Sequence, residues 1–94
     1  MNISIFDFIK IQDKINIIDI RSRERFNNNH IPNASNIPYE LLITTPEKYL
    51  NKNNKYYIYC QKGIKSRQVQ QILVNKGYYV INILGGYEEW ILEK

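Results

Sequence analysis

The chain has 94 residues, of which 44% are hydrophobic and 23% are charged. This length suffices for one domain with one core, so we expect residues 1–94 to form a single domain. The composition argues against a disordered chain, and no apolar run is long enough to cross a bilayer. The start lacks the basic region and small-residue cleavage site of a signal peptide. We therefore expect a cytoplasmic protein without a membrane partner.

Cysteine and histidine are scarce, with Cys60 and His30 the single examples of each. One cysteine excludes an internal disulfide, and one cysteine with one histidine is too few for an ordinary zinc site. Thiol chemistry would therefore use Cys60 with a partner from outside. The net charge of +4 is compatible with anionic partners, but the basic residues are interleaved with acids, which favours an ordinary solvated lysine surface. The chain has no recognisable nucleic-acid-binding motif, so we expect no nucleic-acid partner.

The first half of the chain alternates strand and helix patterns. Residues 2–5 are a weak strand candidate, and Ser4 is placed to cap a short helix over residues 5–11. Residues 16–20 are almost continuously apolar and rich in isoleucine, which is typical of a strand buried on both faces. Residues 35–37 are a second weak strand candidate.

The second half repeats this alternation with stronger signals. Residues 56–59 and 79–83 are runs of aromatic and β-branched residues, which predict two buried strands. From Ser66 onward apolar residues recur at helical spacing, and Gly77 is expected to end that helix in a left-handed conformation. Residues 87–92 can form a closing helix after a glycine turn.

Strands that alternate with helices indicate an α/β fold with an open, mainly parallel sheet. Five strand candidates predict a three-layer α/β/α arrangement with a five-stranded central sheet. Functional sites of such sheets lie beyond the carboxyl ends of the strands. Cys60 directly follows a predicted strand, so we expect it at that edge.

The loop after Cys60 has the features of an anion-binding cradle. It contains Gly63 and two lysines, Lys62 and Lys65, and it leads into a helix expected to begin near Ser66. Such a short loop can turn several backbone N–H groups inward, and the helix adds its positive N-terminal end. This environment stabilises a thiolate or a bound anion, which predicts a reactive Cys60.

Three segments resemble the rhodanese family. The loop Cys60-Gln61-Lys62-Gly63-Ile64-Lys65-Ser66 resembles its active-site loop, Cys-x-x-Gly-x-Lys-Ser. Asp19-Ile20-Arg21 and residues 30–38, which read His-Ile-Pro-Asn-Ala-Ser-Asn-Ile-Pro, resemble its first signature. Residues 84–90, Leu-Gly-Gly-Tyr-Glu-Glu-Trp, resemble its closing Gly-Gly-x-x-x-Trp. The matches run from about residue 17 to residue 90 in the expected order.

The resemblance implies a rhodanese-like fold and a sulfurtransferase that carries a persulfide on Cys60. A small anionic donor such as thiosulfate would supply a sulfur atom, and a thiol, cyanide or a protein would accept it. The resemblance implies no metal and no organic cofactor. The substrate-binding residues it implies are Gln61, Lys62, Gly63, Ile64, Lys65 and Ser66.

Two other functions use the same cysteine. A non-catalytic carrier could receive sulfur from a cysteine desulfurase and pass it to a protein acceptor. A cysteine-dependent phosphatase of the same fold would need arginine after five intervening residues, but Ser66 stands there and Arg67 follows it. The usual histidine before the cysteine is also replaced, by Tyr59. The sequence thus favours sulfur transfer over phosphatase activity.

This chain departs from the family pattern at four positions. Asn29 and Asn33 replace glycines, and asparagine tolerates left-handed backbone better than most residues. Arg25 occupies a position that is often acidic. Lys65 replaces a common arginine, which keeps the charge but loses the planar fork for bidentate anion binding. The change at Lys65 bears on substrate preference, and the change at Arg25 argues against a local ion pair with a neighbouring residue.

For the remaining singled-out residues we expect structural roles. Asp19 and Arg21 should form an ion pair or a loop anchor, and His30 should be a structural histidine. Residues 85–90 should provide a turn and, through the tryptophan, a core anchor. Ser66 should cap the helix that follows the loop, with its hydroxyl able to face the sulfur.

Overall fold

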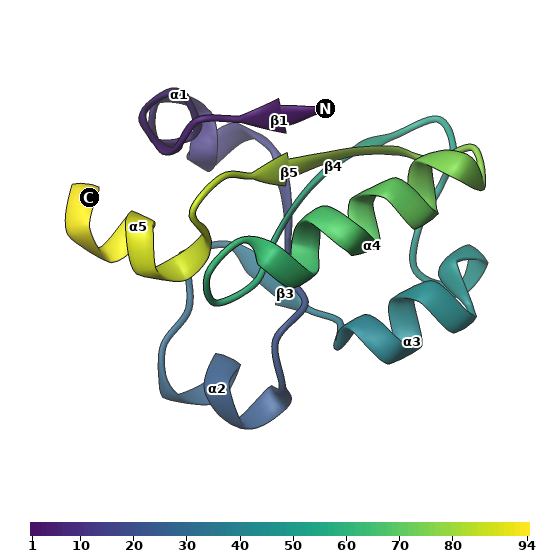
Figure 1. Ribbon diagram of the computed structural model, residues 1–94, viewed down its shortest axis with the longest axis horizontal. Coiled ribbons are helices and arrows are strands. Elements are labelled where there is room, and N and C mark those ends of the chain that lie inside the picture. Colours follow the sequence, from purple (N-terminus) through teal and green to yellow (C-terminus); the bar gives the residue numbers. More distant parts are fainter.

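Five parallel strands form the centre of the computed structural model, which describes residues 1–94 (Figure 1). Their order in the sheet is β1-β5-β4-β2-β3, and every neighbouring pair is parallel. The strands are β1 (Asn2–Ile3), β2 (Asn16–Asp19), β3 (Ala34–Asn36), β4 (Lys55–Tyr59) and β5 (Tyr79–Ile83). The α-helices are α1 (Ile5–Ile11), α2 (Arg23–Asn28), α3 (Tyr39–Thr44), α4 (Ile64–Asn75) and α5 (Gly86–Glu93), with short 3-10 turns at Gln12–Lys14 and Pro46–Lys48.

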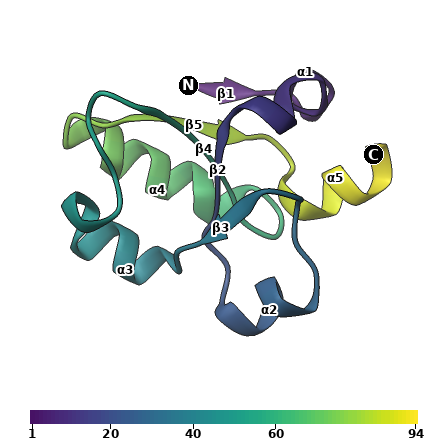
Figure 2. The same ribbon diagram turned by 180° about the vertical axis from the view of Figure 1, so that it is seen from behind.

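Alternate side chains of β4 enter two separate cores. Tyr56 and Ile58 pack with residues of α3 and α4 on one face of the sheet. Tyr57 and Tyr59 pack with residues of α1 and α5 on the other face. The sheet therefore lies between two helical layers, which confirms the predicted three-layer α/β/α fold (Figures 1 and 2). Cys60 continues the alternation and belongs to the α4 face.

Two predicted helix boundaries are confirmed and one is wrong. Ser4 caps α1, because its side chain accepts a hydrogen bond from the N–H of Asp7 at 3.1 Å. Gly77 adopts a left-handed conformation (φ 95°) directly after Lys76, the C-cap of α4. Ser66 does not cap α4. Gly63, with φ 91°, turns the chain so that the helix begins earlier, and Ser66 lies within its first turn.

Two short helices, α2 and α3, lie in a stretch where the sequence has no clear helical period. Each has six residues, which is too short for an apolar period to be visible. Ser22 caps α2 by accepting a hydrogen bond from the N–H of Arg25 at 3.3 Å. The longest helix, α4, has 12 residues, and none of the helices combines the length and apolarity needed to cross a membrane.

Candidate active site

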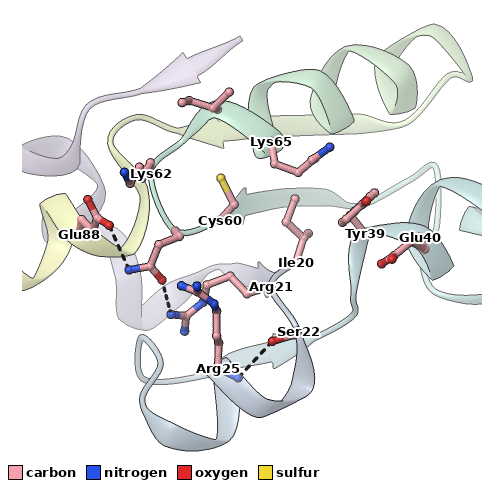
Figure 3. A pocket seen from close by; sticks show the side chains of 12 residues that line it. Ile20, Arg21, Ser22, Arg25, Tyr39, Glu40, Cys60, Lys62, Lys65 and Glu88 are labelled. Carbon is pink, nitrogen blue, oxygen red and sulfur yellow. Dashed lines mark hydrogen bonds between the residues drawn. The ribbon is translucent and has the colours of Figure 1, made fainter.

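The carboxyl ends of β2 and β4 bring the site together. These strands are direct neighbours, and Asp19 pairs in register with Tyr59. The residues that follow them, Ile20 and Arg21 after β2 and Cys60 after β4, therefore meet at one edge of the sheet (Figure 3). This is the edge at which the sequence predicted Cys60.

Backbone N–H groups surround the sulfur of Cys60. The cysteine is only 7% exposed, and its Sγ accepts hydrogen bonds from the N–H of Gly63 at 3.1 Å and of Ser66 at 3.3 Å. The N–H groups of Ile64 and Lys65 have no acceptor within the protein. The start of α4 thus offers both occupied and free donors, together with the positive end of the helix, to negative charge at this position.

The side chain of Ser66 links the sulfur to the interior of the sheet. Its Oγ lies 3.4 Å from the Sγ of Cys60 and donates a hydrogen bond to the Oδ1 of Asn82 at 2.6 Å. The Nδ2 of Asn82 donates in turn to the Oδ1 of Asn2 at 3.3 Å. Ser66 and Asn82 are both buried. The predicted contact between the Ser66 hydroxyl and the sulfur is therefore present, and Asn82 fixes that hydroxyl in place.

A pocket of about 570 Å³ opens beside Cys60, and its wall is rich in positive charge. Four of its lining residues are cationic and two are carboxylates. Figure 3 shows the sulfur between the side chains of Lys62 and Lys65. The lining residues are Ile20, Arg21, Ser22, Arg25, Tyr39, Glu40, Cys60, Gln61, Lys62, Ile64, Lys65 and Glu88.

Three of the four pocket cations have no carboxylate partner. The structure has two salt bridges, Lys10 with Asp7 and Arg21 with Asp19, so Arg25, Lys62 and Lys65 take no part in one. Lys65 instead lies over the ring of Tyr39, with its Nζ 4.6 Å from the centroid. These cations are exposed and remain available to an anion in the pocket.

Asp19 and Arg21 form the predicted ion pair, and it is buried. The Nη2 of Arg21 lies 2.7 Å from the Oδ2 of Asp19, and Arg21 also donates through its Nε and backbone N–H to the same carboxylate. Tyr59 donates its hydroxyl proton to the Oδ2 of Asp19 at 2.6 Å. On its outer side, Arg21 donates to the Oε1 of Gln61 at 3.0 Å. The ion pair therefore anchors the loop that carries the cysteine.

Burial and hydrogen bonding around Asp19 also fix the charge states of its partners. Burial acts to lower the pKa of Arg21, but the hydrogen bond and the charge of Asp19 together raise it above its ordinary value. Burial, reinforced by the hydrogen bond to Asp19, strongly raises the pKa of Tyr59. Arg21 thus stays a cation and Tyr59 a neutral donor.

His30 has local contacts and lies outside the pocket. Its ring stacks on Phe26, with the centroids 3.8 Å apart, and its Nδ1 lies 2.9 Å from the backbone oxygen of Phe26. The side chain is not among those that line the pocket beside Cys60. These contacts agree with the structural role expected for this histidine.

The segment of residues 85–90, which contains two glycines, donates backbone hydrogen bonds to the cysteine loop (residues 60–66). The N–H of Tyr87 donates to the backbone oxygen of Cys60 at 2.9 Å, and the N–H of Glu88 donates to that of Gln61 at 3.1 Å. Gly86 has φ 62°, and a Cβ at this position would lie 2.5 Å from the oxygen of Cys60. The turn predicted here is therefore confirmed, and its glycine permits the close approach of two backbone segments.

The tryptophan of this segment anchors α5. Trp90 is buried, and its Nε1 donates to the Oε1 of Gln12 at 2.9 Å. Its ring stacks with that of Tyr87. The predicted core anchor is present.

Replacing Gly86 by alanine should destabilise the protein more than replacing Gly77. Both substitutions place a side chain at positive φ, which costs about 1–2 kcal/mol. At Gly77 the new Cβ meets only the flexible side chain of Lys52, at 3.4 Å or more. At Gly86 it meets backbone atoms of the cysteine loop, which adds about 1–3 kcal/mol. Free energies of unfolding from denaturant titration will measure both losses, and equal losses would contradict this role of Gly86.

The predicted site residues separate into two groups in the structure. Cys60, Gln61, Lys62, Ile64 and Lys65 line the pocket, whereas Gly63 and Ser66 contact the sulfur through their N–H groups. Other residues that line the pocket or support the sulfur were not predicted from the sequence as site residues: Ile20, Ser22, Arg25, Tyr39, Glu40, Asn82 and Glu88.

A positional signal existed for some of these unassigned residues. Ile20 and Ser22 follow β2, whose carboxyl end lies at the same sheet edge as Cys60. Glu88 follows the closing glycine turn. Tyr39 and Glu40 lie on α3, for which the sequence has no clear helical pattern.

Comparison with known proteins identifies the family of this chain. The family model described as the Rhodanese-like domain matches residues 7–93. The thiosulfate sulfurtransferase GlpE of Coxiella burnetii is 33% identical over 86 residues, which cover 90% of this chain and 78% of that protein.

Solved structures agree with the family model. The rhodanese-like domain protein of Staphylococcus aureus superposes with a TM-score of 0.86 at 31% identity, covering 96% of this chain and 91% of that one. SSP1007 of Staphylococcus saprophyticus gives a TM-score of 0.87 at 32% identity, with coverages of 95% and 91%. Because the family model spans almost the whole sequence, and solved structures with that domain share the fold, this chain belongs to the rhodanese-like domain family.

Proposed function

We propose that this protein is a sulfurtransferase that carries a persulfide on Cys60. The observation that supports this proposal most is the position of the sulfur, which accepts two backbone hydrogen bonds at the start of α4 beside a cation-rich pocket. The similarity to a protein named thiosulfate sulfurtransferase favours the same activity. The inferred donor is a small anion such as thiosulfate, and the acceptor is a thiol, cyanide or a protein.

The reaction proceeds in two steps, and both use the sulfur of Cys60. The Cys60 thiolate attacks the outer sulfur of thiosulfate, the S–S bond of the donor breaks, and sulfite leaves with the electron pair. An acceptor nucleophile then attacks the outer sulfur of the resulting persulfide, and the electron pair of the broken bond returns to Cys60. This is nucleophilic catalysis with a covalent intermediate.

The start of α4 stabilises the negative charge in both steps. The N–H groups of Gly63 and Ser66 point at the Sγ, and those of Ile64 and Lys65 are free to bind an additional sulfur or oxygen atom. Fixed donors of this kind need no reorganisation during the reaction. The exposed ammonium groups of Lys62 and Lys65 offset the repulsion between a thiolate and an anionic donor.

Replacing Lys62 and Lys65 by alanine should lower kcat/KM for thiosulfate by about two- to fivefold for each lysine, because both are exposed and their charges are screened. A double variant of Lys14 and Lys48, two exposed lysines outside the pocket, loses the same net charge and serves as the control. Steady-state kinetics at low salt will compare the two. Equal kcat/KM values in the two double variants would mean that the backbone donors alone bind the anion.

Profiling of donors tests whether the protein acts on small molecules or as a sulfur carrier. Turnover with thiosulfate and cyanide supports an enzyme that works independently. Persulfide formation only from a cysteine desulfurase would support a carrier and would contradict the choice of donor made here.

A further inference from the structure

The pocket beside Cys60 is larger than a small inorganic anion requires. Its volume of about 570 Å³ falls in the range of about 300–1,000 Å³ that is common for pockets that bind organic ligands. The two proposed steps both use the sulfur of Cys60, but the first needs a sulfur donor and the second a sulfur acceptor. The room that a small donor leaves unused is therefore available to the second partner, the sulfur acceptor.

Arg25 places an unpaired positive charge in this pocket from outside the cysteine loop. It comes from α2, and the only hydrogen bond it makes within the pocket wall runs from its backbone N–H to the Oγ of Ser22. Its guanidinium has no hydrogen-bond acceptor and no salt bridge. In Figure 3 the side chain of Arg25 rises from α2 and overlaps that of Arg21 in the view, whereas Lys65 lies on the other side of Cys60.

Arg21 differs from Arg25 because its guanidinium already forms hydrogen bonds with other groups of the protein. It binds the carboxylate of Asp19, the side chain of Gln61 and the backbone oxygen of Asn29. A ligand would have to compete with these partners for Arg21. Arg25 has no such competition, so it is the cation on this side of the pocket that a ligand carboxylate can pair with.

Apolar side chains line other parts of the pocket wall. Ile20, Tyr39 and Ile64 all belong to this wall, and Ile64 is 67% exposed. A hydrocarbon chain can pack against such side chains, whereas a compact inorganic anion gains nothing from them. The wall therefore suits a molecule with an apolar segment between its reacting sulfur and a distant charge.

We propose that Arg25 selects sulfur acceptors that are organic thiols with a carboxylate remote from the sulfur. The inference rests on the proposed sulfur transfer and adds the chemical class of the acceptor. The thiolate of the acceptor attacks the outer sulfur of the Cys60 persulfide, and the S–S bond of the persulfide breaks. Cys60 leaves as a thiolate, and the product is the persulfide of the acceptor, so no oxidant or reductant is needed.

The test compares two thiols of equal chain length, mercaptohexanoate and mercaptohexanol, which differ in the remote carboxylate. The protein is first loaded with thiosulfate and freed of excess donor, and loading is verified by intact mass. The rate of persulfide discharge is then measured with each thiol at low salt. We expect mercaptohexanoate to discharge the wild-type protein about two- to fivefold faster, the range for one exposed charge pair.

Variants of α2 show whether Arg25 is the cause of that preference. Arg25→Ala should bring the ratio of the two rates close to one, and Arg25→Glu should make mercaptohexanol the faster thiol. Arg23→Ala removes an exposed arginine of the same helix that does not line the pocket, and it should keep the wild-type ratio.

The possible failures are distinguishable. If no sulfur loads onto Cys60 from thiosulfate, the proposed function fails and this inference fails with it. If loading is normal but the two thiols discharge the wild-type protein at equal rates, only the inference is overturned. If the Arg25→Glu variant still reacts faster with mercaptohexanoate, the inference about Arg25 is also overturned. The preference for the carboxylate would then be assigned to Lys62 and Lys65.

Discussion

Replacing Cys60 by serine should abolish sulfur transfer and leave the fold intact. A serine hydroxyl is not ionised at neutral pH and cannot form a persulfide. The smaller oxygen can still accept hydrogen bonds from the N–H groups of Gly63 and Ser66, so the start of α4 should keep its geometry. Thiosulfate:cyanide turnover and a denaturant titration will measure the two effects.

The effect on turnover should be complete because Cys60 is the only cysteine in the chain. No other thiol can take over the covalent step. Wild-type protein alkylated at Cys60 provides a second inactive form with an unchanged sequence. Turnover retained by the serine variant would place the chemistry on a different residue.

Replacing Asp19 by alanine should cause a large loss of folding stability. The change leaves the buried guanidinium of Arg21 without its counter-ion and the hydroxyl of Tyr59 without its acceptor. Breaking a buried pair by removing one partner costs about 3–5 kcal/mol. The whole stability of a domain is about 5–15 kcal/mol, so the variant should be marginally folded. Free energies of unfolding by urea titration will measure the loss.

Tyr59→Phe is the matched control for this substitution. It removes the hydrogen bond from the hydroxyl to Asp19 but leaves the ion pair with Arg21 in place, so the loss should be about 1 kcal/mol. If Asp19→Ala lost no more stability than Tyr59→Phe, the carboxylate would not be the anchor of this edge of the sheet.

The central strands and the cysteine loop could be predicted because their sequence signals are local. The run of apolar residues in β4 is long enough to mark a strand buried on both faces, and the structure confirms it. The position of Cys60 at the sheet edge follows from that strand and from the parallel topology. Gly77 marks the end of α4 because a left-handed residue there favours glycine.

The residue at which α4 begins could not be predicted, because the loop contains two residues, Gly63 and Ser66, that could each precede a helix. Serine is a common N-cap, so Ser66 was a reasonable expectation. The structure instead uses the left-handed conformation of Gly63 to begin the helix, and it buries Ser66 between the sulfur and Asn82. The contact with Asn82 joins residues sixteen positions apart, which no local pattern reveals.

The far side of the pocket was missed for a similar reason. Its residues come from α2 and α3, which are too short to show a helical period. In the sequence, Arg25 stands out only because it occupies a position that is often acidic in the family. Only the tertiary structure places it in the same pocket as Cys60 and shows that Arg21, its neighbour, is already paired.

Intact mass spectrometry after incubation with thiosulfate will show directly whether Cys60 takes up a sulfur atom. We expect a gain of the mass of one sulfur atom, located on Cys60 by peptide mapping, and a return to the original mass after cyanide is added. The Cys60→Ser variant should show no gain. An unchanged mass after exposure to thiosulfate and to a cysteine desulfurase with its substrate would contradict a persulfide on Cys60 and the sulfurtransferase function with it.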